Sequence, residues 1–539
     1  MSGGSGLVIA PILLPLLTGA GMLLLNGERH RSIVAGLNVG ATIALVCIAT
    51  LLLGVSAAGT RDVYQLGNWH APFGIVLVLD RLSALMLLLT NVLALASVVY
   101  SLARWRRAGA HFHSLFQFLL MGLNGAFLTG DLFNLFVFFE LLLAASYGLL
   151  LHGSGLARVK AGLHYIVINL AASLLFLIGV SLIYGVTGTL NMADLAARVP
   201  AVAAESRGLL EAGAGVLAVA FLLKAGMWPL NFWLPTAYAA ASPPVASIFA
   251  IMTKVGVYVV LRLSLLLFGD DAGASAGFGQ EWLLWGGLAT ILFGAIGTLA
   301  SQDTARLGGF SVLISSGTVL AATGIRQVGV TSGALFYLVS STLGISAFFL
   351  LVELIERGRE PGADMIAVTR EAYGEADEAD EAEEEVGITI VATMGLLGIA
   401  FIGCALVIAG LPPLSGFIAK FALLAAALHP ADHPGGAIPG NGWALLAVLV
   451  LSGFATLVAM ARAGIRIFWA SLDRTVPRVR VIEMAPIMFL LFICAAQTVL
   501  AGPVMRFMQA TAQSLHAPAG YVSDVLDNGA WGSRQAEGK

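Results

Sequence analysis

Charged residues are scarce in this chain, which excludes an ordinary soluble domain. Only 11% of its 539 residues are charged, whereas a typical soluble domain has about 25%. The hydrophobic fraction is 58% and the mean hydropathy is +0.91. Most of the molecular surface must therefore face lipid or other helices.

Cysteines and catalytic motifs are equally scarce. Cys47, Cys404 and Cys494 each lie inside an apolar run with no second cysteine nearby, so we expect small buried side chains and no disulfide. We find no HExxH, paired CxxC, Walker loop, dinucleotide fingerprint or nucleophile elbow in a suitable context. We therefore expect no metal and no cofactor. The absence of a basic stripe argues against nucleic acid as a partner.

Long apolar runs dominate what is present. A bilayer core takes roughly 20 apolar residues per helix, and runs of this kind recur from Leu7 to Met508. The sequence predicts an all-α polytopic membrane protein with about fourteen transmembrane helices. The predicted helices cover residues 7–25, 33–54, 80–101, 112–129, 131–152, 162–188, 208–241, 244–267, 281–300, 307–325, 331–357, 386–428, 441–468 and 484–508.

The basic residues predict the orientation of these helices. No positive charge precedes the first apolar run, so we interpret that run as a transmembrane helix and not as a cleaved signal. If it enters from outside, the inward loops hold sixteen basic residues and the outward segments hold seven. The positive-inside rule then predicts that both termini face outward.

Prolines interrupt two of the runs. Pro229 lies inside the run 208–241, and Pro412 and Pro413 lie inside the run 386–428. Each proline removes a backbone hydrogen bond, and unpaired backbone persists at membrane depth only where protein or water receives it. One broken helix in each half of the chain is typical of an inverted-repeat transporter. Kinks with no role in transport are the alternative.

Four ionisable residues lie near the middle of apolar runs: Glu140, Lys224, Lys254 and Lys420. Each charge costs on the order of 2.5–3.5 kcal/mol or more to place there, so we expect it to be paired, hydrated or functional. Lysine suits proton relay because burial and a nearby cation lower its pKa towards neutrality. While Glu140 pairs with Lys224, the lysine keeps its proton. If the pair opens, Lys224 can release that proton towards Lys254. A static ion pair that fixes helix packing is the alternative.

Further polar residues have simpler interpretations. Asp131 is expected to cap the helix that follows it. We expect Asp80, Arg81 and His164 to be interfacial, and we assign no role to Arg262, which either lines an exit or snorkels to the surface.

Three segments resemble the antiporter-like subunit superfamily. They read GDLFNLFVFFELLLAASYGLL at 130–150, KAGMWPLNFWLPTAYAAASPPVASIFAIMTKVGVYVVLR at 224–262 and AGLPPLSGFIAKFALL at 409–424. The superfamily includes the A- and D-type subunits of the Mrp cation/proton antiporter and the large pumping subunits of respiratory complex I. The phrase DLFNLFVFFE and the overall length most resemble the D-type Mrp subunits, and the resemblance covers most of the chain.

The resemblance implies two inverted five-helix repeats and a division of the chain. Helices 1–3 would occupy residues 1–110, the first repeat 111–267 and the second repeat 281–468. The remaining parts of the chain would be an acidic cytoplasmic loop at 358–385, helix 14 at 484–508 and a polar tail at 509–539. The acidic run Glu371 to Glu385 is expected to be a solvated loop.

The resemblance also implies the roles of the site residues. Glu140, Lys224, Lys254 and Lys420 match positions of a proton-transferring axis in the membrane plane. Many relatives carry a histidine in the eleventh helix, where this chain has Ser340, Ser341 and Thr342. We therefore expect the link between the lysine sites to run through hydroxyls and water.

The implied function is that of a proton-translocating subunit within a multi-subunit Na+/H+ antiporter. Potassium and lithium stay open as the exchanged cation. The expected partners are other Mrp subunits, A- and C-like above all, within a bacterial cytoplasmic membrane. Two alternatives stay open: a pumping subunit of complex I or of a membrane hydrogenase, and a membrane scaffold that transports nothing. Four charges near the midplane argue against the scaffold.

Overall fold

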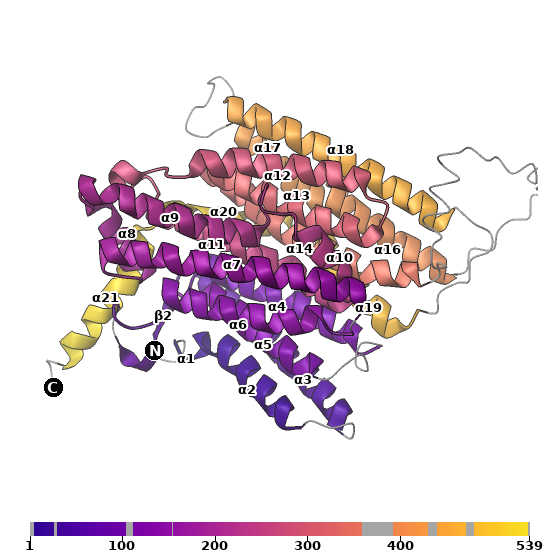
Figure 1. The fold of residues 1–539 in the computed structure, drawn as a ribbon, viewed down its shortest axis with the longest axis horizontal. Coiled ribbons are helices and arrows are strands. Elements are labelled where there is room, and N and C mark those ends of the chain that lie inside the picture. Colours follow the sequence, from indigo (N-terminus) through magenta and orange to yellow (C-terminus); the bar gives the residue numbers. More distant parts are fainter. Residues whose placement is uncertain are drawn as a thin grey trace, which may run out of the picture.

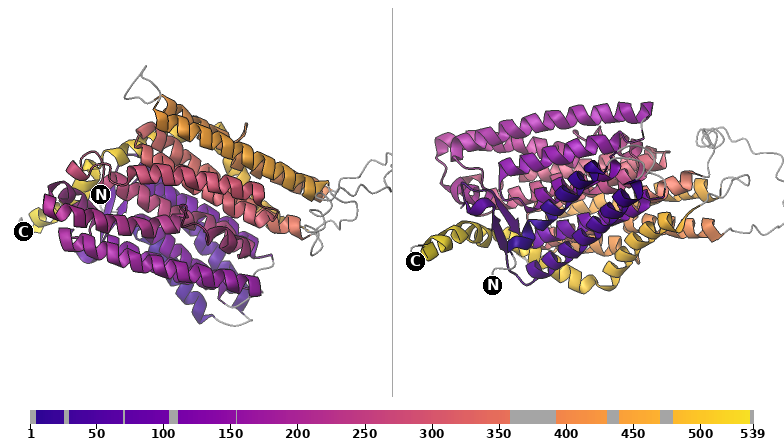
Figure 2. Two further views of the ribbon diagram at one scale, coloured as in Figure 1. Left: turned by 45° about the horizontal axis from the view of Figure 1, so that its top comes forward. Right: turned by 90° about the horizontal axis from the view of Figure 1, so that it is seen from below.

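The fold is a bundle of long, roughly parallel helices (Figure 1). The computed structural model describes residues 5–25, 30–69, 71–103, 111–153, 155–357, 392–429, 439–469 and 479–536. The predicted acidic loop 358–385, with Glu371 to Glu385, lies outside the described residues. Both ends of the described chain lie at the same end of the bundle (Figure 2).

Twelve helices of the described chain are long and apolar enough to cross a membrane. They are α3 (Arg31–Ala57), α4 (Arg81–Ser101), α6 (Leu132–Leu150), α7 (Leu156–Thr187), α9 (Ala204–Ala225), α11 (Pro243–Leu267), α12 (Gln280–Ala300), α13 (Thr304–Ile325), α14 (Val328–Glu356), α16 (Ala392–Ala409), α18 (Gly440–Phe468) and α19 (Val481–Val499). Two shorter apolar helices, α2 (Ala10–Leu24) and α5 (Phe112–Leu128), bring the set to fourteen. Each of the fourteen predicted runs overlaps one of them, so the prediction of a polytopic helical fold is confirmed.

Smaller elements gather at the end of the bundle that carries both termini (Figure 1). Strands β1 (Asp62–Gln65) and β2 (Val76–Leu79) form an antiparallel hairpin there. Beside it lie the short helix α8 (Met192–Arg198) and the C-terminal helix α21 (Ala519–Ala536). Short 3-10 turns follow β1, α8 and α11, and the four-residue helix α1 (Ser5–Val8) precedes α2.

Helices α11 and α14 occupy the centre of the bundle. Every residue in the most apolar eighteen-residue stretch of each is buried inside the protein, whereas only a third of the corresponding stretch is buried in α3. Any polar side chain on the two central helices therefore has protein for its surroundings and must find partners there.

Both predicted breaks are present. Helix α9 ends at Ala225, and the chain resumes a helix only at α10 (Leu234–Ala240). Helix α16 ends at Ala409, and α17 (Ser415–Leu428) follows it. Each half of the chain therefore contains one interrupted helix, at the position that the prolines predict.

Glycine ends the first part of each broken helix, before the proline is reached. Gly226 and Gly410 adopt positive φ angles of 72° and 78°, a conformation that glycine reaches without strain. The next amide reaches back five residues in both cases, from Met227 to the Leu222 carbonyl and from Leu411 to the Leu406 carbonyl, each at 2.9 Å. This is the hydrogen bond of a Schellman motif.

The C-terminal region differs from the prediction. The run 484–508 is not one helix, because α19 ends at Val499 and α20 (Ala501–His516) begins in a new direction (Figure 2). Pro503 has no N–H for the Val499 carbonyl and is tolerated only in the first turn of a helix. The predicted polar tail 509–539 is helical as far as it is described, since α20 and α21 cover most of it.

Candidate functional site

Lys224 lies in the last turn of α9, two residues before the break. It is 5% exposed, and its Nζ is 4.9 Å from the centre of the Phe139 ring on α6. Glu140, the next residue on α6, is half-buried, and its Oε1 has no hydrogen-bond partner within the described part of the chain. The Lys224 Nζ likewise has none there.

These two charged side chains do not form a direct ion pair. Among the described residues, no oxygen of Glu140 lies within 4.0 Å of the Lys224 Nζ. The static ion pair that was the alternative for Glu140 and Lys224 is thus not formed in this structure. The aromatic face of Phe139 provides a partial substitute for it, because the ring attracts a lysine ammonium placed over it.

Lys254 lies near the middle of α11 and is fully buried. Its Nζ donates a hydrogen bond to the Ser316 hydroxyl on α13 at 3.0 Å. The residue before it, Thr253, has its hydroxyl 2.6 Å from the Tyr238 hydroxyl on α10. The segment that follows the first break is thus attached to the helix that carries Lys254.

Helices α9 and α11 approach each other very closely beside these two lysines. A Cβ placed on Gly256 would lie 2.8 Å from the backbone nitrogen of Ala225. Lys224 and Lys254 flank this crossing, one on each helix. The absence of a side chain at Gly256 therefore lets the two helix backbones approach closely beside the lysines.

Hydroxyl groups extend from Lys254 across α13 and α14 to α17. Ser315 on α13 lies 2.7 Å from Ser341 on α14, measured between the hydroxyl oxygens. Ser340 on α14 lies 2.7 Å from Ser415, the first residue of α17. Of the three hydroxyls predicted as a link, Ser340 and Ser341 face neighbouring helices. Thr342 instead donates to a carbonyl of its own helix at 2.5 Å.

Sequence reasoning missed three of these hydroxyls, namely Ser315, Ser316 and Ser415. A signal for two of them was present, since Ser315 and Ser316 form a consecutive pair inside an apolar run, as Ser340 and Ser341 do. Two adjacent side chains on a helix point in different directions, so such a pair can contact two neighbours at once.

Lys420 lies beyond the second break and points back across it. Its Nζ donates to the Ala409 carbonyl, the last of α16, at 2.7 Å. That carbonyl belongs to the negative end of the helix dipole, which favours a cation. A Cβ on Gly410 would lie 2.6 Å from the Lys420 Cδ, so a larger residue there would displace the lysine side chain as well as strain the φ angle.

Asp80 opens α4 as expected, but the sequence did not reveal its partner. Its Oδ1 forms a buried ion pair with Arg262 Nη2 at 2.8 Å, and the Arg262 guanidinium lies over the rings of Tyr258 and Tyr521. Asp80 also caps α4, accepting a hydrogen bond from the Ser83 amide. Burial would raise the pKa of Asp80, but the Arg262 charge and these hydrogen bonds hold it below its ordinary value.

The expected helix cap at Asp131 is present. Asp131 caps α6, since its side chain accepts a hydrogen bond from the Asn134 amide. His164 is exposed near the start of α7 and packs edge-on against the Phe232 ring. The described residues contain no group of three His, Cys, Asp or Glu side chains that would hold a metal ion.

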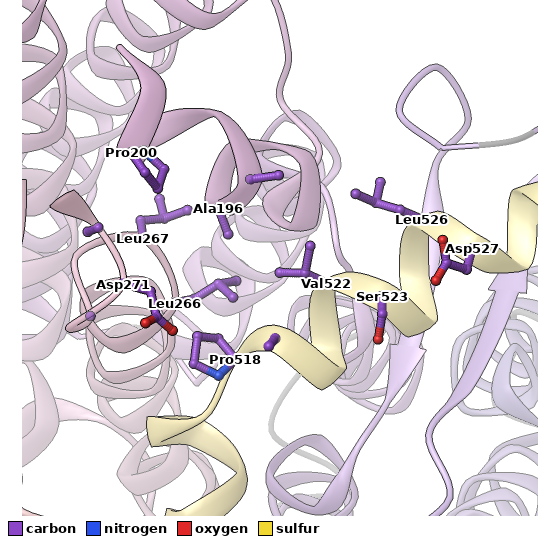
Figure 3. A pocket seen from close by; sticks show the side chains of 14 residues that line it. Ala196, Pro200, Leu266, Leu267, Asp271, Pro518, Val522, Ser523, Leu526 and Asp527 are labelled. Carbon is purple, nitrogen blue, oxygen red and sulfur yellow. The ribbon is translucent and has the colours of Figure 1, made fainter.

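A cavity of about 420 Å³ lies between α8, the end of α11 and α21 (Figure 3). Its lining includes Pro200, Leu266, Asp271, Val522 and Asp527. None of the predicted site residues lines this cavity. It is therefore separate from the polar line formed by the three buried lysines and the serines between them.

Comparison with known proteins identifies the family. The family described as "NADH:quinone oxidoreductase/Mrp antiporter, TM" matches residues 129–432, a stretch that contains every residue of the polar line. The chain belongs to this family. One member, from Rhizobium meliloti (strain 1021), is named as the probable D subunit of a K+/H+ antiporter. It is 62% identical over 526 residues, which cover 96% of this chain and 97% of that protein.

More distant members agree. The D subunit of the Na+/H+ antiporter of Alkalihalophilus pseudofirmus (strain ATCC BAA-2126 / JCM 17055 / OF4) is 32% identical, and the match covers 97% of this chain and 99% of that protein. A chain in the structure of the Mrp complex from Dietzia sp. DQ12-45-1b superposes with a TM-score of 0.81 at 26% identity. The superposition covers 98% of this chain and 100% of that one. The resemblance to the D-type Mrp subunits is thus confirmed.

Proposed function

We propose that this chain is the proton-translocating subunit of a multi-subunit monovalent cation/proton antiporter. It would act as part of a secondary transporter and not as an enzyme. The observation that carries the proposal is the buried polar line from Lys224 through Lys254 and the serine hydroxyls to Lys420. Near-full-length similarity to proteins named as D subunits of cation/proton antiporters supports it.

The geometry suggests how a proton would pass along this line. Lys224 can lose its proton more readily when Glu140 is not paired with it, because no adjacent carboxylate then stabilises the ammonium. Lys254 would accept that proton across the α9–α11 crossing and pass it to hydroxyls or water near Ser316. The hydroxyl contacts at Ser315, Ser341, Ser340 and Ser415 would extend the route towards Lys420.

Potassium is the cation that we favour, because of the relative that shares most of its sequence with this chain. The 62% identical relative is named for K+/H+ exchange, whereas relatives at 32% and 33% identity are named for Na+/H+ exchange. Sodium, the expectation from the sequence, is therefore assayed beside potassium.

The partners would be the other Mrp subunits, with A- and C-like subunits as direct neighbours. The complex would lie in the bacterial cytoplasmic membrane with both termini of this chain outside. The chain also resembles chains of a sulfane sulfur reductase complex and of respiratory complex I, with TM-scores of 0.81 and 0.74. At 22% identity these likenesses concern the fold alone.

The test is cation-dependent collapse of an imposed pH gradient in everted vesicles. The vesicles come from antiporter-deficient cells that express the whole complex with this chain wild type, Lys224→Ala or Lys160→Ala. Lys160 is an exposed lysine near the start of α7 and serves as the control. We expect collapse with the wild type and the control, and none with an assembled Lys224→Ala complex. Full exchange by that variant would overturn the proposal.

A further inference from the structure

We infer that protons reach Lys254 from one end of the bundle by a side route through Glu353 and three serines: Ser97, Ser247 and Ser346. The inference rests on the proposed function, because it assigns an entry route to the same lysine. Glu353 and the three serines all lie outside the polar line that joins Lys224, Lys254 and Lys420.

The three serines meet where three helices touch. The Ser97 hydroxyl on α4 donates to that of Ser247 on α11 at 3.1 Å, and the Ser247 and Ser346 oxygens on α11 and α14 lie 2.5 Å apart. All three side chains are fully buried. Many hydroxyls in these helices, such as that of Thr90, instead donate to a carbonyl of their own helix. A contact of three hydroxyls between helices is a ready-made segment of a proton-conducting chain.

This serine cluster lies on the same helix faces as the groups it would connect. Ser247 and Lys254 are seven residues apart on α11, and Ser346 and Glu353 are seven residues apart on α14. Seven residues make nearly two turns, which returns a side chain to the same face about 10.5 Å along the axis. The cluster is therefore about midway between Lys254 and Glu353, with water needed to complete the route on either side.

Glu353 lies in the last turn of α14, which ends at Glu356. Its Oε2 accepts a hydrogen bond from the Tyr100 hydroxyl at 2.9 Å. Its Oε1 is 2.8 Å from Arg357 Nη2, and Arg357 Nη1 is 2.8 Å from a carboxylate oxygen of Glu483 on α19. One guanidinium thus serves two carboxylates.

That sharing suits Glu353 to collect protons. When Glu353 takes up a proton, Arg357 remains paired with Glu483, so the guanidinium charge keeps a partner. Tyr100, which bonds to Glu353, is one turn from Ser97 on α4. Glu353 and the serine cluster therefore contact the same face of α4.

The transfer would move one proton along this chain of hydrogen bonds. The Glu353 carboxyl releases its proton to water, each hydroxyl accepts a proton on oxygen and gives up its own, and the neutral amine of Lys254 becomes an ammonium. In the orientation predicted from the basic residues, this end faces the cytoplasm, so the route would admit protons from that side.

The test measures exchange by the assembled complex with Glu353→Gln, Ser247→Ala or Thr90→Val. Glu353→Gln keeps the shape of the side chain but removes the proton carrier, and we expect exchange to fall roughly 10-fold or more, as for a lost acid–base group. Ser247→Ala should lower it several-fold and raise the solvent isotope effect in D2O. Thr90→Val removes a buried hydroxyl from α4 and should change neither.

Wild-type exchange by Glu353→Gln, with Lys224→Ala inactive, would overturn the route and leave the proposed function intact. Wild-type exchange by Lys224→Ala would overturn both. If Glu353→Gln fails to assemble, Glu353→Asp, which keeps a carboxyl group, and Ser247→Ala decide the matter. A wild-type rate and isotope effect in Ser247→Ala would mark the serine cluster as packing only and overturn the route.

Discussion

The two broken helices are made alike but leave their lysines in opposite states. AGMWPL at 225–230 and AGLPPL at 409–414 each end a helix at glycine. Lys224 lies before its break and its Nζ has no hydrogen-bond partner in the described structure, whereas Lys420 lies after its break and is bonded to the Ala409 carbonyl. The break supplies the opening in the backbone, but the position of the lysine decides whether its charge is satisfied.

The surroundings differ in the same way. Around the first break, the Nδ2 of Asn231 and the Nε1 of Trp233 are buried without hydrogen-bond partners among the described residues, as is the Oε1 of Glu140. At the second break, the Ser415 hydroxyl is bonded to Ser340. Unsatisfied buried groups are costly and invite water or movement. This difference predicts that the first break is where the site changes during transport and that the second is comparatively fixed.

Replacing each lysine by methionine tests this contrast most strongly. We expect both variants to lose roughly 100-fold or more of the exchange rate, because each removes a proton carrier. Lys420→Met should also destabilise the complex by about 1–3 kcal/mol, since it leaves the Ala409 carbonyl unpaired. Lys224→Met loses no hydrogen bond, only the contact of the ammonium with the Phe139 ring, so its melting temperature should fall less than that of Lys420→Met. Equal melting temperatures for the two variants would contradict the difference between the breaks.

Glu140→Gln should have a milder effect on exchange. The amide keeps the shape of the carboxylate and its hydrogen bonding but loses the charge that controls Lys224. We expect a loss of about 10-fold in exchange, measured in the same vesicles, with normal assembly. Glu281→Gln, at the start of α12, is the matched control. Wild-type exchange by Glu140→Gln would mean that its charge serves only the structure.

Substitutions in the hydroxyl link between the two breaks should have a smaller effect on the exchange rate. Ser341 bonds to the Tyr337 carbonyl of its own helix and also contacts Ser315 on the next helix. By contrast, the only hydrogen bond of the Thr342 side chain within the described structure is to the backbone of its own helix. Ser341→Ala should slow exchange several-fold, and Thr342→Val should leave it unchanged. A slower Thr342→Val variant beside a normal Ser341→Ala variant would reverse the assignment.

The buried ion pair of Asp80 with Arg262 should affect stability but not exchange. The pKa of Asp80 is lower when folded, so its stabilisation is full above its ordinary pKa of about 4 and is lost as the pH falls through the folded value. Asp80→Asn should therefore lower the melting temperature at pH 7 and flatten its decline towards acid pH. An unaltered pH dependence would show that the pair contributes little.

The helices and breaks could be predicted well because their signals are local. Apolar length identifies a membrane helix, and Pro229, Pro412 and Pro413 identify the two interrupted runs. The four midplane charges were found because each is costly in an apolar run. What the prolines did not reveal is that Gly226 and Gly410 end the helices first.

Contacts between distant parts of the chain were not revealed by the sequence. Asp80 and Arg262 are 182 positions apart, and no periodicity within either helix shows that they meet. Ser415 is 75 positions from Ser340, and the rotation of α14 decides that Ser340 and not Thr342 reaches it. Such pairings follow from tertiary packing, which single-sequence patterns do not contain.

The close crossing of α9 and α11 at Gly256 has a mechanical consequence. Because the two helix backbones approach closely there, sliding one helix along the other would bring side chains into the contact, whereas a pivot about that point would not. Helix α10 is held to α11 through Tyr238 and Thr253. Any conformational step at the first break must therefore be absorbed by residues 226–233, which act as a hinge between two clamped ends.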